Sequence, residues 1–463
     1  MKSRMQHFLL TLLALPFSLG ILSAQQQVVQ FDYDEEAMTF EDCIRYALQN
    51  NPDLQKVQLD EVAGEYLIKE VRGTGLPQVS GSAGYNDNFR LPTQLLPGEI
   101  LGAPGTTIPV QFGVRHNLSA GVEVNQLLFS KSYFTGLKAA EASKGLYQLN
   151  TLQTKENLVY NIAQTYLQLQ ITDKQKEILT ANLNRVVQLI DITQAQYEEG
   201  LVKKVDVDQL RVNRTNLSTE IQNIEIGYRQ QLNLLKFYMG MPIEQEIEIS
   251  RLKDNTPAYT LAPELSLSNN STLRLLQKQQ ELSQLELQSV KDGYYPSLYA
   301  FAQYNWQGQT NTLFSSEDPM NSFTSGVWGV SLKVPIFDGL QKKFKAQQVE
   351  VAQLQLQQDI RKVTNLNQME FHNASEKLRQ SRTLISQQEE NMQLAEELYS
   401  ITQLSYKEGV APLSELLNAE TSLKEAQTQY LTATLQEKLA ELDHLKTSGE
   451  LLHLIEEAKL INN

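Results

Sequence analysis

The sequence holds a single cysteine, Cys43, so no disulfide can form within the chain of 463 residues. Histidines are almost as scarce, and the four beyond residue 24 include no two at the spacing of metal ligands. Glycine-rich phosphate loops and nucleophile elbows are absent, and most carboxylates fall in charged, solvated helix patterns. We therefore expect no metal site, no cofactor and no enzymatic activity.

Long apolar runs are also lacking, since no stretch after residue 24 approaches the ~20 residues of a membrane-spanning helix. Acidic residues outnumber basic ones by 54 to 40, which argues against nucleic acid as a partner. The first 24 residues combine Lys2 and Arg4 with an apolar run and end in Ser23-Ala24, the layout of a secretory signal peptide. We expect an exported protein with no cysteine placed at the cleavage site for lipid attachment.

Proline is missing from two long segments rich in Ala, Leu, Gln, Glu and Lys. The first, 130–199, predicts a helix of roughly 100 Å, because an α-helix rises ~1.5 Å per residue. Gly200 is placed to end this helix in a left-handed conformation, and a second helix is expected to start near Asp206. The second long segment, 338–408, ends in the same way at Gly409.

The two halves of the chain repeat one pattern: Tyr197 and Tyr406, Gly200 and Gly409, and Asp206 and Glu415 are all 209 positions apart. Each half reads as helix, strand pair, long helix, turn and helix, which indicates an internal duplication. We expect a signal peptide at 1–24, a first repeat at 25–262 and a second repeat at 263–463. The first repeat is expected to hold helix 39–74, strands 77–89 and 118–128 with a long loop at 90–117 between them, long helix 130–199, helix 205–239 and connector 240–262. The second is expected to hold helix 263–294, strands 296–307 and 326–336 with a loop at 308–324 between them, long helix 338–408, helix 414–447 and C-terminal tail 449–463.

The four predicted strands alternate apolar and polar residues, so each has one apolar face. A soluble hairpin packed on a core would show the same alternation. Export, a length of about ten residues and aromatic side chains on the apolar faces favour contact with lipid instead. Four strands cannot close a barrel, so this interpretation requires several copies. The residues expected to face lipid include Tyr85, Val122, Trp306, Trp328 and Val330.

The sequence contains the stretch TFEDCIRYALQNNPD at 39–53, the Leu-Pro and Tyr-Pro strand entries, Pro335-Ile-Phe-Asp-Gly339 and the paired Tyr-x-x-Gly turns. Together these features resemble the TolC family of outer-membrane efflux proteins. The resemblance covers essentially the whole mature chain. It implies a mostly α-helical protein with a membrane β part. Three chains would contribute four strands each to a twelve-stranded barrel in the outer membrane of a Gram-negative bacterium, continued by a tunnel of long helical hairpins through the periplasm.

The resemblance also implies a function and partners. The homotrimer would be the exit duct of a tripartite efflux or type I secretion system, together with a periplasmic adaptor and an inner-membrane pump of the RND type or an ABC exporter. The adaptor would dock on the turns, and the periplasmic entrance would close at the same tips. The implied docking residues are Gly200, Leu201, Gly409 and Val410, and the implied entrance residues are Tyr197, Lys203, Lys204, Asp206, Tyr406 and Glu415.

The second turn departs from the family pattern, because Asn418 and Ala411 stand where many members have a further acid and a basic residue. We therefore expect Lys203 and Lys204 to act as partners for Glu415, and Tyr406 to donate a hydrogen bond toward Asp206. As local structure alone, each glycine is also an ordinary helix stop.

Two other interpretations compete with the channel. An exported coiled-coil scaffold or adhesion spacer would explain the long helices and the acidity, but not the strand pairs that interrupt both halves at the same place. An adaptor protein would also have a helical hairpin, though not two long ones flanked by strands. The sequence does not determine the substrate, and drugs, metal ions and polypeptides all remain possible cargo.

Overall fold

The computed structural model describes residues 37–97, 102, 104–251, 265–313 and 319–452. Residues Met38–Asn463 form one compact unit. The expected signal peptide, the connector beyond residue 251 and the tail beyond residue 452 lie outside the described residues. No helix in the described ranges is long and apolar enough to cross a membrane.

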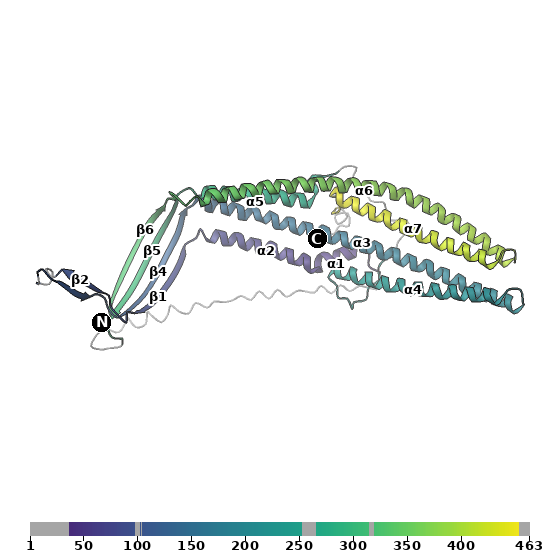
Figure 1. Ribbon diagram of the computed structural model, residues 1–463, viewed down its shortest axis with the longest axis horizontal. Helices are drawn as coiled ribbons and strands as arrows, with labels where there is room; N and C mark the ends of the chain where they lie inside the picture. Colours follow the sequence, from purple (N-terminus) through teal and green to yellow (C-terminus); the bar gives the residue numbers. More distant parts are fainter. Residues whose placement is uncertain (1–36, 98–101, 103, 252–264, 314–318, 453–463) are drawn as a thin grey trace. The chain divides into compact units, whose positions relative to one another are not determined.

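The described part of the first half contains four α-helices, of which the long α3 packs against both α2 and α4 (Figure 1). A capping box between Thr39 and Asp42 starts the first helix. The side chain of Asn51 accepts the N–H of Leu54 at 2.9 Å, and Pro52 follows it as the first helical residue, so the predicted helix 39–74 is divided in two there. The helices are α1 (Phe40–Asn50), α2 (Pro52–Gly73), α3 (Lys131–Glu198) and α4 (Lys204–Met239).

The second half repeats this arrangement, with α6 packed against α5 and α7. The long helix begins three residues later than expected, because Gly339 and Leu340 both adopt the left-handed conformation and delay the start to Gln341. Helix α5 likewise begins at Ser271, after a short 3₁₀ turn, rather than at 263. The elements are η2 (Leu267–Asn269), α5 (Ser271–Asp292), α6 (Gln341–Lys407) and α7 (Leu413–Ser448).

The shorter helices meet end to end at two equivalent junctions. Helix α4 ends at Gly240, whose φ of +72° places the backbone directly against the carbonyl of Asn50, where a Cβ would clash. Helix α7 ends at Gly449, where a Cβ would lie 2.9 Å from the Cβ of Asn269, just before α5. Both positions therefore require glycine for the left-handed turn and for the close approach.

The strands form one four-stranded antiparallel sheet in the order β1-β4-β5-β6 (Figure 1). Each half contributes one hairpin, and the β4–β5 pairing joins the halves. The segment 90–117, which we expected to be a long loop, instead carries a separate two-stranded sheet. Prolines 97 and 109 lie within its two strands. The strands are β1 (Gln78–Asp87), β2 (Thr93–Pro97), β3 (Thr107–Gln111), β4 (His116–Phe129), β5 (Ser297–Thr310) and β6 (Asn321–Lys333).

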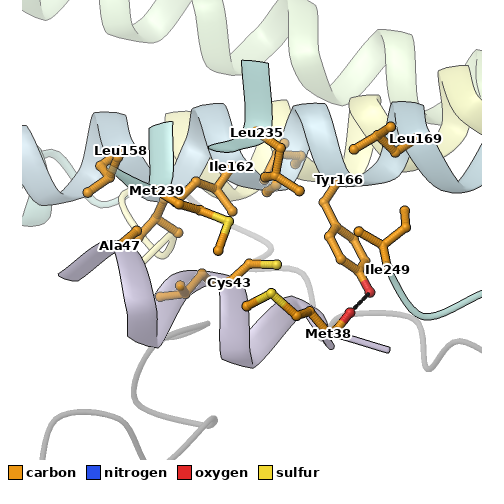
Figure 2. Packing of buried hydrophobic residues seen from close by; sticks show 14 of the residues in the cluster. Met38, Cys43, Ala47, Leu158, Ile162, Tyr166, Leu169, Leu235, Met239 and Ile249 are labelled. Atoms are coloured by element: carbon orange, nitrogen blue, oxygen red, sulfur yellow. Dashed lines mark hydrogen bonds between the residues drawn. The ribbon is translucent and has the colours of Figure 1, made fainter. Parts of the chain in front are cut away.

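The largest hydrophobic cluster lies where α1 packs on the middle of α3 and the end of α4 (Figure 2). The hydroxyl of Tyr166 donates to the carbonyl of Met38 at 3.1 Å, and Met38 pairs with Ile249 of the connector in a short parallel bridge. Cys43 is completely buried in this cluster, and burial raises the pKa of its thiol to about 12. Cys43 is therefore a packing residue of the core between α1, α3 and α4.

Candidate functional site at the helix turns

The turn between α3 and α4 is closed by Gly200, whose φ is +77°. Its N–H donates to the carbonyl of Tyr197 at 2.9 Å, and the N–H of Leu201 donates to the carbonyl of Gln196 at 2.8 Å. These bonds satisfy carbonyls that the end of α3 would otherwise leave unpaired. The side chain of Leu201 is left strongly exposed.

The turn between α6 and α7 has the same geometry. Gly409 has a φ of +72°, its N–H donates to the carbonyl of Tyr406 at 3.0 Å, and the N–H of Val410 donates to that of Ser405 at 2.9 Å. Val410 is as strongly exposed as Leu201. The two turns therefore present one apolar side chain each at equivalent positions, immediately after the glycine.

The two equivalent tyrosines differ in environment. Tyr406 is only 5% exposed, and its hydroxyl lies 2.8 Å from Oγ1 of the buried Thr193 on α3. Tyr197 is 40% exposed. The difference arises because the last turn of α6 packs against α3 and α7, whereas the last turn of α3 has an open side. Of the pair, Tyr406 is the residue that links the two helical hairpins.

The charged residues expected at the entrance lie in the turns and in the first helical turns after them. Asp206 accepts the backbone N–H of Lys203 at 3.0 Å, so its carboxylate caps the start of α4. Glu415 is exposed in the first turn of α7, where the helix dipole favours an acid. Within the described residues, neither Lys203 nor Lys204 forms an ion pair with Glu415.

The expected hydrogen bond from Tyr406 to Asp206 is not formed within the chain. The hydroxyl of Tyr406 pairs with Thr193 instead, and the carboxylate of Asp206 is engaged by its own helix start. Sequence spacing placed both residues at the tips but did not reveal that Tyr406 turns inward.

A buried polar cluster that the sequence reasoning missed lies between the hairpins, next to the apolar residues around Tyr406. Glu420 of α7 is buried and accepts the side-chain N–H of Asn213 on α4 at 3.0 Å. Burial raises the pKa of Glu420, while Arg185, Asn213 and Lys424 oppose that rise. The guanidinium of Arg185 lies 5.4 Å from the ring centre of Tyr399, which brings α3, α4, α6 and α7 together at this level.

One signal in the sequence could have located this cluster. Leu413, Leu416, Glu420 and Leu423 follow the three- and four-residue spacing of one helix face, and the three leucines are buried core residues. An acid at a core position of such a face requires a polar partner from another helix.

The five strand residues expected to face lipid share one face of the sheet. Val122 lies opposite Tyr304 on β5, and Trp306 is two residues further along that strand, hence on the same side. Val330 pairs with Ala300 on this face, and Trp328 pairs with Ala302. Tyr85, Val122, Trp328 and Val330 are exposed, and the ring of Trp306 covers Gly308.

The described residues contain no group of three or more metal-ligating side chains that could hold an ion. The candidate features in these residues are two turns with exposed apolar tips, a buried polar cluster between the hairpins, and a sheet with one apolar exposed face.

The sequence model of the family described as "Outer membrane efflux protein" matches residues 43–241 and 262–445. The chain belongs to this outer-membrane efflux protein family. It is 22% identical over 415 residues to the outer membrane protein TolC of Salmonella enteritidis, covering 83% of this chain and 76% of TolC.

Solved structures of outer-membrane channels share the fold. The Campylobacter jejuni CmeC outer membrane channel matches with a TM-score of 0.72 and 14% identity, covering 91% of this chain and 90% of CmeC. The outer-membrane channel OprN matches with a TM-score of 0.71 and 15% identity, covering 89% and 90%. The efflux family thus accounts for the mostly helical fold with its few antiparallel strands.

Proposed function

We propose that this protein is the outer-membrane exit duct of a tripartite efflux or type I secretion system and conducts substrates passively to the exterior. Three copies would close a twelve-stranded barrel in the outer membrane, and their helices would form the periplasmic tunnel. The observation that carries the proposal is the open four-stranded sheet, one exposed face of which is apolar and aromatic. Such a face is stable against lipid, and such a sheet is stable in lipid only when its edges are closed by other copies.

The partners in this proposal are a periplasmic adaptor and an inner-membrane pump of the RND type or an ABC exporter. The exposed apolar tips Leu201 and Val410 support adaptor docking at the turns, because burying each would remove apolar surface from water. The residues Tyr197, Lys203, Lys204, Asp206, Tyr406 and Glu415 are proposed to control the entrance at the same tips.

Three measurements test the proposal. Membrane fractionation should recover the protein with the outer membrane, and light scattering of the detergent-solubilised protein should give the mass of three chains. In planar bilayers the same preparation should produce discrete conductance steps. A single-chain mass, or recovery in the soluble periplasmic fraction, would instead support a non-conducting scaffold.

A further inference from the structure

The two outer strands of the sheet each have one unpaired edge. In the described part of the chain, β1 pairs only with β4 and β6 pairs only with β5. Their free N–H and C=O groups need partners in a barrel, since lipid offers none. The inference below concerns which residues meet at these edges, and it rests on the proposed function.

The two hairpins can be superposed residue by residue. The strand entries Pro77 and Pro296 correspond, as do Phe129 and Phe337, which precede the long helices α3 and α6. With these anchors, the observed pairs of the first hairpin fall on observed pairs of the second. Gly81–Val122 falls on Ala300–Val330, and Tyr85–Leu118 falls on Tyr304–Gly326.

The pairing between β4 and β5 shows how the second strand of one hairpin meets the first strand of the next. In that pairing Val122 lies opposite Tyr304. The residue equivalent to Val122 in the second hairpin is Val330, and the residue equivalent to Tyr304 in the first is Tyr85. A further copy placed beside β6 by the same rule would therefore bring its Tyr85 opposite Val330.

We propose that β6 of one copy pairs antiparallel with β1 of the next in this register, with Val330 opposite Tyr85 and Leu332 opposite Ala83 of the neighbouring copy. All four residues lie on the apolar face, so the register continues that face without interruption across the junction. A slip of one residue would turn the polar face of one strand toward lipid.

The helices, like the sheet edges, leave a surface uncovered within one copy. The alignment of Tyr197 with Tyr406 places Leu398 of α6 where α3 has Leu189. Leu189 is 1% exposed because residues of the second repeat cover it, whereas Leu398 is 52% exposed. Helix α6 thus carries an apolar residue that the described chain leaves exposed, as expected if the next copy packs there.

Engineered cysteine pairs test the register. Directly opposite residues on neighbouring strands bring their Cβ atoms close enough for a disulfide, whereas diagonal neighbours are too far apart. The matched pairs are Val330→Cys with Tyr85→Cys, and Leu332→Cys with Ala83→Cys. Within one copy, β4 and β5 separate these positions by at least about 14 Å, so only a link between copies can form. The native Cys43 stays in place because it is completely buried.

The swapped pairs, Val330→Cys with Ala83→Cys and Leu332→Cys with Tyr85→Cys, use the same four substitutions in registers displaced by two residues. After oxidation, non-reducing gels should show linked dimers and closed rings for both matched pairs, and about tenfold less for the swapped pairs. The parent chain and the four single variants should remain unlinked.

The outcomes separate this inference from the proposed function. Preferential linking of the swapped pairs, or no linking in protein that still scatters light as an oligomer, would overturn the register while leaving the channel intact. Protein that is unlinked and has the mass of one chain would overturn both.

Discussion

The hydroxyl of Tyr406 lies 2.8 Å from Oγ1 of Thr193, so one hydrogen bond joins the last turn of α6 to α3 across 213 residues of sequence. Thr193 is fully buried, so without the hydroxyl of Tyr406 its own hydroxyl would lose this hydrogen bond and could not bond to water instead. Losing such a partner costs about 1–3 kcal/mol. This bond holds the two helical hairpins together just behind their turns.

Replacing Tyr406 by Phe together with Asp206 by Ala should raise single-channel conductance in planar bilayers without reducing the trimer yield. The first change removes the bond to Thr193, and the second removes the cap of α4, worth about 1 kcal/mol. Tyr197→Phe with Asp206→Ala is the matched control, because the exposed Tyr197 lacks the contact with Thr193. A double variant that conducts like the parent would show that other residues close the entrance.

Replacing Glu415 by Ala should weaken block of the channel by multivalent cations applied from the periplasmic side. Its carboxylate is exposed at the start of α7, and the carboxylates of several copies would meet at a narrow entrance. An exposed charge interaction is worth ~0–1 kcal/mol, so removing one should raise the inhibitory cation concentration by up to about fivefold. Glu390→Ala, an exposed acid far from the turn on α6, should leave the block unchanged. Equal block in both variants would show that Glu415 does not contribute to cation binding at the entrance.

Replacing Val330 by Arg should destabilise the membrane-inserted protein by about 2–4 kcal/mol, the cost of a cation on the lipid face near mid-strand. The same change at Ser331, which points to the opposite face, should be tolerated. Unfolding in urea from detergent or lipid vesicles measures the difference. Equal destabilisation at the two sites would contradict the assignment of the apolar face to lipid.

Replacing Glu420 by Gln should change how stability depends on pH. Burial holds the pKa of Glu420 above its usual value, so the folded chain keeps this proton to a higher pH than the unfolded chain. The free energy of unfolding of the parent therefore falls as pH rises from the ordinary carboxyl range through the raised pKa. The variant cannot ionise at this position, so it should gain stability relative to the parent across this window and keep a constant advantage above it.

Urea unfolding at a series of pH values checks this expectation, and Glu425→Gln on the exposed side of the same helix is the control. A variant less stable than the parent at every pH would mean that the ionised form of Glu420, held by Asn213 and Arg185, stabilises the fold.

Much of the architecture could be predicted from local patterns. Gly200 and Gly409 marked both long helix ends, because only a residue without a side chain enters the left-handed conformation at low cost. The strict alternation around Val122 and Val330 assigned the strand faces, since side chains in a strand point to opposite sides in turn. Where a local signal was weak, the prediction was wrong: the prolines at 97 and 109 indicated only a loop, yet β2 and β3 pair around them.

Tertiary structure decided what depends on residues distant in sequence. Tyr197 and Tyr406 occupy the same place in the repeat, but the hydroxyl of Tyr406 meets the buried hydroxyl of Thr193 on α3, whereas Tyr197 is left exposed. Glu420 and Asn213 are brought together by the packing of α7 on α4, and periodicity within either helix does not specify that partner. Local periodicity fixes which way a side chain points along its own element, whereas burial and hydrogen bonding depend on which other element lies beside it.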